Sequence, residues 1–191
     1  PAAMPVEPGG FSLTTPPLFA ALAPARNILI GGAGGGFDVY AGLPLALALW
    51  HSGRQVHLAS LSFSELELRD RDSWAAENVA AVTPDSASPD WYFPERTLAR
   101  WLAANDLPAT VYAFPPLGVQ RLRAAYRCLI ERLDIDAVVL VDGGTDILLR
   151  GDESDLGTPV EDLTSVAAVT GLDVAVKLVT CLGFGIDAYH G

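Results

Sequence analysis

The 191-residue sequence is poor in positive charge, which argues against a nucleic-acid-binding function. It contains 12 Lys and Arg residues against 23 Asp and Glu residues, giving a net charge of −11. Nucleic-acid phosphates are bound mainly by Lys and Arg, so we expect no nucleic acid among the partners. Charged residues make up only 18% of the chain and hydrophobic residues 50%. These proportions are typical of a folded globular domain rather than of a disordered chain.

Long apolar runs, secretion signals and cysteines are also scarce. The longest strongly apolar run, residues 41–50, is too short to span a bilayer and contains Pro44. Residues 1–10 lack the basic start of a signal peptide. The chain has two cysteines, Cys128 and Cys181, which we expect to be buried free thiols rather than a disulfide or a metal site. These absences predict a cytoplasmic protein that does not contact a membrane.

A glycine-rich segment between Asn27 and Trp50 is the most informative part of the sequence. Three apolar residues, 28–30, predict a short buried strand, and five of the next six residues are glycine. An apolar, helix-like run then opens at Phe37 and Asp38. Glycines allow close backbone approach, and the first N–H groups of a helix lack intrahelical partners, so such a turn favours an anionic ligand. The predicted ligand-binding residues here are Gly32, Gly34, Gly35, Gly36 and Asp38.

The spacing of the glycines in this loop limits which kinds of ligand are compatible with it. No G-K-[ST] follows, which excludes a P-loop. NAD is not favoured, because Ala33 replaces the middle glycine of the dinucleotide pattern and no acidic residue closes the next strand near Ser60. Another kind of nucleotide remains compatible with the loop. The alternative is a tight strand-to-helix turn without a ligand, although five glycines cost more backbone entropy than a plain turn requires.

Apolar runs and helical periodicities alternate along the chain and predict an α/β fold with a mainly parallel sheet. Residues 1–24 are Pro-rich and predict an irregular N-terminal arm, and residues 25–191 form the α/β domain. Pro44 predicts a kink or restart in the first helix, and Gly53 its end. Residues 70–90 are polar and predict an excursion or lid. Strands are predicted at 28–30, 55–61, 110–114, 137–141 and 174–182. Further helices are predicted after the aromatic segment 91–95 and through Trp101, over 122–133, and from Thr158 to Gly171.

Polar residues follow the predicted strands at their carboxyl ends, where ligands bind in such sheets. Asp142 and Asp146 follow a buried strand and would hold Mg²⁺ through carboxylates and waters. Thr145 would bond a phosphate or sugar, Arg150 would clamp an anion, and His190 would act as a general base. The alternatives are ordinary turn chemistry for the Asp-Gly-Gly segment and an exposed histidine near the chain end. The predicted catalytic residues are Asp142, Asp146, Asp187 and His190, and Gly143 and Gly144 join the ligand-binding set.

Several of these motifs together resemble those of the domain of unknown function 1152 family. They are GGAGGGFDVYAGLPLA (31–46), FPE (93–95), VDGGTDILLRGDE (141–153), LGTPVED (156–162) and LGFGIDAYHG (182–191). The resemblance implies a Rossmann-like three-layer α/β fold but no reaction. Glu95 of the FPE motif completes the ligand-binding candidates. Because chains of this family run longer, we expect the domain to be incomplete without a following segment, either by truncation or by cleavage of a precursor.

Three functional hypotheses follow. The first is a small-molecule enzyme, a hydrolase or transferase, that binds a phosphate-bearing or anionic substrate at the glycine loop with Mg²⁺ on Asp142 and Asp146. The second is a self-processed enzyme cleaved after Gly191, in which a second chain from the same precursor supplies an N-terminal Thr, Ser or Cys nucleophile for amide hydrolysis or acyl transfer. The third is a non-catalytic ligand-binding module.

Overall fold

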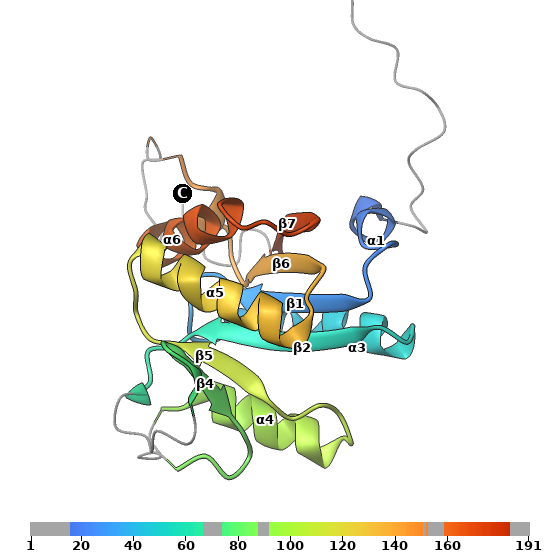
Figure 1. Ribbon diagram of the computed structural model, residues 1–191, viewed down its shortest axis with the longest axis vertical. Coiled ribbons are helices and arrows are strands. Elements are labelled where there is room, and N and C mark those ends of the chain that lie inside the picture. Colours follow the sequence, from blue (N-terminus) through green and yellow to red (C-terminus); the bar gives the residue numbers. More distant parts are fainter. Residues whose placement is uncertain (1–15, 67–73, 88–91, 151, 153–158, 184–191) are drawn as a thin grey trace, which may run out of the picture.

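The structure is a computed structural model that describes residues 16–66, 74–87, 92–150, 152 and 159–183. A sheet of seven strands crosses the molecule in the order β3-β4-β5-β2-β1-β6-β7 (Figure 1). The strands are β1 (Asn27–Gly32), β2 (Gln55–Leu61), β3 (Trp74–Ala76), β4 (Val79–Val82), β5 (Val111–Phe114), β6 (Ala137–Asp142) and β7 (Val176–Cys181). The pairings among β5, β2, β1, β6 and β7 are all parallel. The predicted parallel α/β sheet is therefore confirmed.

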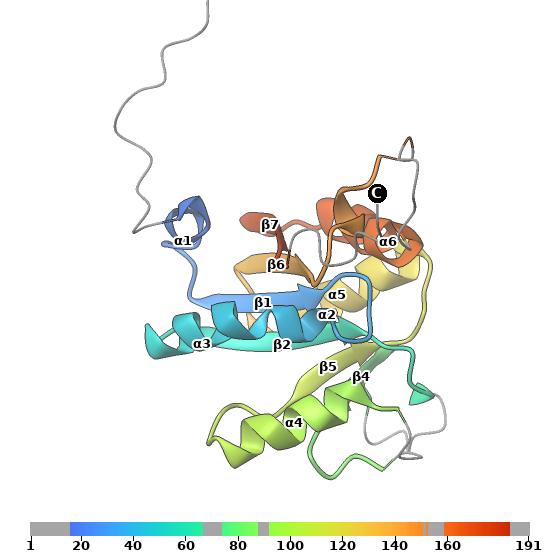
Figure 2. The ribbon, with the colours of Figure 1, turned by 180° about the vertical axis from the view of Figure 1, so that it is seen from behind.

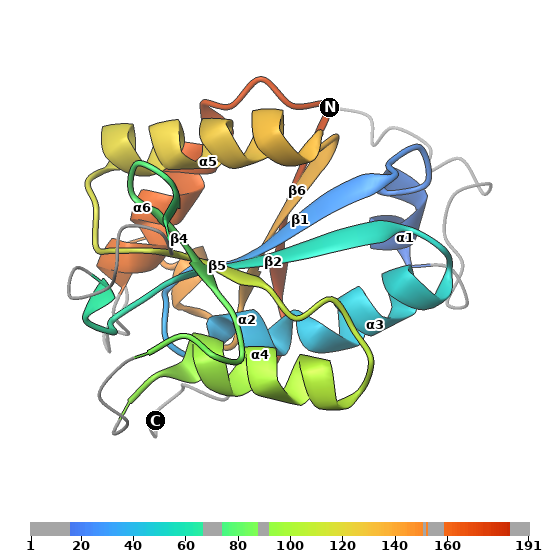
Figure 3. The same cartoon turned by 60° about the horizontal axis from the view of Figure 1, so that its bottom comes forward.

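Helices cover both faces of the sheet, which makes three layers. Figure 3 shows α5 (Val119–Leu133) and α6 (Pro159–Thr170) on one face, and α2 (Asp38–Ala41), α3 (Leu43–His51) and α4 (Pro94–Ala104) on the other. A short helix, α1 (Pro17–Ala21), precedes β1 and lies near its amino end (Figure 2). Because β1, β2 and β6 run parallel, their carboxyl ends lie together at the end of the sheet away from α1, which we call the carboxyl edge.

The core has two halves because successive strand residues point to opposite faces. In β1, Ile28 and Ile30 pack with residues of α3 and α4, whereas Leu29 between them packs with residues of α5 and α6. In β6 the same alternation separates Val139 from Val138 and Leu140. All six residues of β6 are buried. The continuous apolar run in the sequence follows from this burial on both faces.

The first predicted helix is interrupted, as Pro44 indicated. It consists of α2 and α3, which meet at Gly42, and Pro44 lies in the first turn of α3, where a missing N–H costs no hydrogen bond. A Cβ on Gly42 would lie 2.7 Å from a methyl carbon of Ile30, so this junction packs tightly on β1. Gly53 follows α3 with φ of +81°, the left-handed conformation expected just after a helix end.

Three expectations differ from the structure. The segment predicted as an excursion or lid contains the β3–β4 hairpin, whose turn includes Asn78 at φ of +61°, a value that Asn tolerates. Helix α1 lies within the stretch expected to be irregular. Both cysteines are free, but Cys128 is exposed because it lies on the solvent side of α5, and Cys181 is only partly buried.

Thr158, where the sequence predicts the last helix to start, lies outside the described residues. Helix α6 begins at Pro159 and ends immediately before Gly171, close to the predicted bounds. Within the described residues, no helix combines the length and the apolar composition needed to cross a membrane.

Candidate metal centre at the carboxyl ends of β1 and β6

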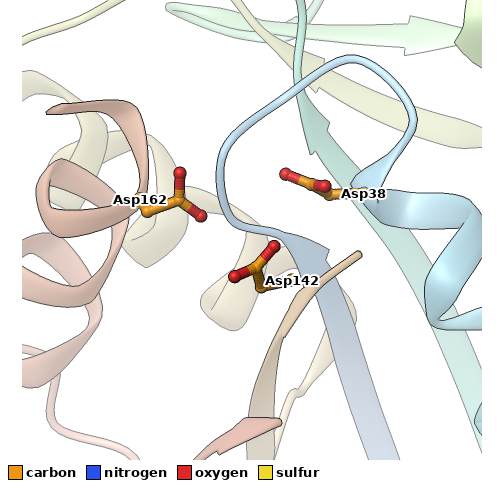
Figure 4. Close-up of side chains that lie close together, drawn as sticks. All are labelled: Asp38, Asp142 and Asp162. Carbon is orange, nitrogen blue, oxygen red and sulfur yellow. The ribbon is translucent and has the colours of Figure 1, made fainter. Parts of the chain in front are cut away.

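Three aspartates meet at the carboxyl edge of the sheet. Asp38 begins α2 just after the glycine loop, Asp142 ends β6, and Asp162 lies in the first turn of α6. One carboxylate oxygen from each lies within 4.8 Å of the other two. Figure 4 shows the three side chains pointing toward one another from three separate elements. We call these three residues the carboxylate cluster.

Backbone amides hold Asp38 in place. The Gly34 N–H donates to one carboxylate oxygen at 2.7 Å, and the Gly143 N–H donates to the other at 3.2 Å. One bond comes from the glycine loop and the other from the turn after β6, which is 105 residues away in the sequence. The Asp38 carboxylate therefore links the two loops that form the site.

Asp142 is held in the same way. The Gly144 N–H donates to Oδ1 at 2.7 Å, and the Ile147 N–H donates to Oδ2 at 3.1 Å. The side chain is only 2% exposed. A carboxylate oxygen that accepts one N–H keeps further lone-pair capacity. The Asp-Gly-Gly segment thus makes a turn, as the alternative interpretation proposed, and that same turn orients Asp142 toward the cluster.

Asp162 differs from the other two aspartates. Its side chain is 2% exposed, and among the described residues its Oδ1 has no hydrogen-bond partner. One turn further along α6, the buried Ser165 hydroxyl donates to the Ala33 carbonyl at 2.7 Å and fastens the helix to the glycine loop. Burial of an unpaired polar atom is costly. The cluster therefore contains an oxygen whose environment favours a bound cation or a proton.

The glycine loop passes between these side chains. A Cβ on Gly34 would lie 2.5 Å from an Asp162 carboxylate oxygen and 2.7 Å from an Asp38 oxygen. Glycine is therefore required here for space. The Gly34 amide, predicted to face an anionic ligand, instead donates to Asp38. With only four residues, α2 offers little helix dipole, so the described contacts favour a carboxylate site over a bare anion site.

The electrostatics of the cluster follow from its burial. Burial raises the pKa of Asp162 from 3.8 to about 8, with further increases from the charges of Asp146, Asp142 and Asp38. Burial also raises the pKa of Asp38 to about 6, partly offset by its two backbone hydrogen bonds. Closely spaced carboxylates in a low-dielectric site disfavour one another's ionisation. A divalent cation or protons would relieve this repulsion.

Several other predicted residues follow Asp142 in the chain. Asp146 begins the 3₁₀ turn η3 (Asp146–Leu148), and its charge raises the pKa values of Asp38 and Asp162, but it is not among the three clustered carboxylates. Thr145, half-buried, precedes that turn. Arg150 is exposed and lies 3.9 Å from the carboxylate of Asp152. The predicted roles of these residues in ligand binding remain predictions.

Glu95 is a buried carboxylate whose charge acts on Tyr40 of α2. It is fully buried in the first turn of α4, and the Ser64 hydroxyl donates to it at 3.5 Å. The Tyr40 hydroxyl, whose pKa burial and the Glu95 charge raise to about 12, donates to the Pro94 carbonyl. Asp187 and His190, and with them the self-processing hypothesis, fall outside the described residues.

Sequence reasoning missed Asp162 as a site residue. It appeared only as the last residue of the motif 156–162, near a predicted helix start, where acidic residues are common on helix-dipole grounds alone. A signal was present, however, because Asp162 and Ser165 occupy the same helix face as the buried Ala168 and Val169. Two polar residues on a buried face require a polar partner.

Comparison with known proteins is informative about the family alone. Residues 66–189, about two thirds of the chain, match the family model described as Protein of unknown function (DUF1152). The matched segment includes Asp142 and Asp162. No curated protein matches the sequence. The resemblance inferred from the motifs is thus confirmed, and the chain belongs to the DUF1152 family.

Proposed function

We propose that this protein is a divalent-cation-dependent enzyme, a hydrolase or transferase, that acts on a phosphate-bearing small molecule at the carboxyl edge of its sheet. Asp38, Asp142 and Asp162 are the proposed cation ligands. The pair expected from the sequence was Asp142 and Asp146; in the proposed set Asp142 stays, and Asp38 and Asp162 join it in place of Asp146. An all-oxygen, carboxylate-rich set favours hard cations such as Mg²⁺ and Mn²⁺.

The observation that carries this proposal is the unpartnered oxygen of Asp162. It is buried within a cluster whose other two carboxylates are already oriented by four backbone N–H groups. Hydrogen bonds that fix ligand orientation in advance are characteristic of metal sites. Gly34 keeps the space between the carboxylates free of a side chain.

The charge of the site requires a bound cation if the substrate carries a phosphate. A phosphate brought to three carboxylates, on a protein with a net charge of −11, would be repelled unless a cation lay between them. A cation held by the cluster would act as a Lewis acid and as a template for the substrate phosphate. Asp38 and Asp142 would then fix the coordination geometry. Asp162 would supply the third carboxylate ligand from α6.

Manganese binding tests the cation site. We expect Mn²⁺, followed by electron paramagnetic resonance, to bind the wild-type protein at one site and to be displaced by Mg²⁺. Asp162→Asn should weaken binding at least about tenfold, since it removes an anionic ligand. Asp173→Asn is the matched control because Asp173 is exposed in the α6–β7 connection. It lies before the amino end of β7, away from the carboxyl ends of the strands. Equal Mn²⁺ affinity in wild type and Asp162→Asn would contradict the proposal.

Turnover tests the proposed reaction class separately. Phosphate release or transfer from a panel of sugar phosphates and nucleotides should require Mg²⁺ or Mn²⁺ and should be lost in Asp162→Asn but not in Asp173→Asn. Cation binding without turnover of any phosphate ester would favour the non-catalytic binding module instead.

A further inference from the structure

Three aromatic side chains lie around the tip of the glycine loop, next to the carboxylate cluster. Phe37, at the start of α2, is 62% exposed, and Phe63, just after β2, is 50% exposed. Tyr92, before α4, meets Phe37 edge to face with ring centroids 6.1 Å apart. We call these three residues the aromatic patch. Large apolar side chains gathered at the surface beside a polar site indicate a binding surface more often than isolated exposed residues do.

The glycine loop joins this aromatic patch to the carboxylate cluster. A Cβ on Gly34 would contact the carboxylates, whereas one on Gly35 would lie 3.0 Å from the ring of Phe63, and one on Gly36 would lie 3.0 Å from the Tyr92 hydroxyl. Gly35 and Gly36 have φ values of +95° and +60°, which bring the backbone close under the rings. The loop therefore contacts acidic groups at Gly34 and aromatic rings at Gly35 and Gly36, the next two residues.

The distance between the two sides limits what can bridge them. Two residues of chain extend at most about 7 Å. The charge of Asp38 also contributes to the raised pKa of Tyr92, after burial and the charge of Glu95, as expected for groups this close. A ligand with an anionic group and an apolar group on a short linker can therefore reach from the carboxylate cluster to the aromatic patch.

From this juxtaposition we propose that the substrate is a nucleotide, whose phosphate is held through the cation at the carboxylate cluster and whose planar base packs against Phe37, Phe63 and Tyr92. This inference rests on the proposed function and specifies its substrate class. Aromatic side chains stack on the π-face of any base, so the aromatic patch recognises a planar ring and leaves base identity to other contacts. A sugar phosphate would contact the cation alone.

The test compares ligands that have the base, the phosphate or both. Binding of AMP, GMP, CMP and UMP, each with Mn²⁺, is measured by calorimetry beside ribose 5-phosphate and adenosine. We expect at least one nucleotide to bind more tightly than ribose 5-phosphate. Phe63→Ala and Phe37→Ala should each weaken that nucleotide about tenfold and leave Mn²⁺ and ribose 5-phosphate affinities unchanged. Phe19→Ala is the control, since Phe19 is an exposed phenylalanine on α1, far from this edge.

The outcomes separate this inference from the proposed function. If Mn²⁺ binds as proposed but every nucleotide binds no better than ribose 5-phosphate, or if the phenylalanine variants bind nucleotides as the wild type does, the nucleotide inference is overturned and the cation site stands. If Mn²⁺ does not bind, the proposed function fails. Saturation-transfer NMR with adenosine alone then still tests the aromatic patch. An adenosine signal that is lost in Phe63→Ala supports a binding site for the base, and the absence of any signal overturns it.

Discussion

At the scale of single residues, the carboxylate cluster combines two aspartates whose carboxylates are held by backbone hydrogen bonds with one that has an oxygen without a described partner. Asp38 and Asp142 each accept two backbone hydrogen bonds, whereas Oδ1 of Asp162 has no partner in the described part of the chain. A ligand-binding site commonly carries a local cost of this kind, which a bound ligand then relieves.

Without divalent cations, Asp162→Asn should stabilise the protein at alkaline pH. The folded-state pKa of Asp162, about 8, lies above the ordinary value of 3.8, so between these values the folded protein retains a proton that the unfolded chain has released. Stability therefore falls as the pH rises from about 4 to about 8. At pH 8.5 we expect the variant to gain on the order of 3 kcal/mol, or about 5–10 °C in Tm, and at pH 4 nothing.

Thermal unfolding in EDTA across this pH range measures the effect. Asp173→Asn should show no such pH-dependent gain. Parallel pH profiles for wild type and Asp162→Asn would contradict the assignment of a neutral, buried Asp162 carboxyl in the cation-free protein.

Gly34→Ala should remove the space that a cation needs. The added methyl would lie 2.5–2.7 Å from oxygens of Asp162 and Asp38 and would force these carboxylates apart. We expect Mn²⁺ affinity to fall at least about tenfold. Gly118→Ala is a suitable control, because a Cβ there meets nothing within 4 Å. Unchanged Mn²⁺ affinity in Gly34→Ala would place the cation elsewhere.

At the scale of elements, the position of α6 determines whether the third carboxylate reaches the other two. The Ser165 hydroxyl ties α6 to the Ala33 carbonyl, and Arg123 of α5 donates to the carbonyls of Ala167 and Ala168 further along the same helix. The glycine loop on the other side is fixed by the bond from the Ala33 N–H to the Val141 carbonyl. The cluster thus depends on contacts between α6, β1 and β6.

Ser165→Ala should weaken both the fold and the cation site. It removes a buried hydrogen bond and leaves the Ala33 carbonyl without that donor, at a cost of about 1–2 kcal/mol, or about 3–6 °C in Tm. Mn²⁺ affinity should fall severalfold because Asp162 is held less firmly. Thr164→Ala is the neighbouring control, since among the described residues its hydroxyl bonds within α6, to the Val160 carbonyl. An unchanged Mn²⁺ affinity in Ser165→Ala would show that this contact does not position Asp162.

Elements with a strong pattern could be predicted from the sequence, and their relative placement could not. The apolar run 137–141 and the three- and four-residue spacing of Leu122, Tyr126 and Leu129 predicted β6 and α5. The β3–β4 hairpin was missed because its short strands are built largely from alanine, which has weak strand preference. Asp38 was predicted as a ligand-binding residue from its place after the glycine loop, and Asp142 from its place after a strand. Asp162 reaches the site through the packing of α6, and its only sign in the sequence is that it shares the apolar face of that helix with Ser165.

At the scale of the whole molecule, the parallel order of β1 and β6 brings together groups that are far apart in the chain. β1 and β6 pair in parallel, so both end at the same edge, where Asp142 and the glycine loop meet. The antiparallel β3–β4 hairpin extends the sheet beyond β5, on the side away from β6. The strand order therefore accounts for the location of the candidate site, and the family match leaves its chemistry open.

Saturating Mg²⁺ should stabilise the whole protein, and more strongly at high pH. A ligand at about 100 times its Kd adds about 2.7 kcal/mol, or about 5–10 °C in Tm. Protons compete for the carboxylates, whose pKa values are about 6 for Asp38 and about 8 for Asp162, so the gain should be large at pH 8.5 and small at pH 5. Differential scanning calorimetry with and without Mg²⁺ measures it. The same gain at both pH values would point to a site without these carboxylates.

The location of a bound cation is the most direct test of the central claim. A crystal grown with Mn²⁺, with diffraction data collected at the manganese absorption edge, reports the ion's position independently of any assay. We predict an anomalous peak between Asp38, Asp142 and Asp162, at bonding distance from carboxylate oxygens of all three. A manganese peak elsewhere would contradict the account. So would the absence of a peak among these residues in crystals equilibrated with saturating Mn²⁺ at pH 8.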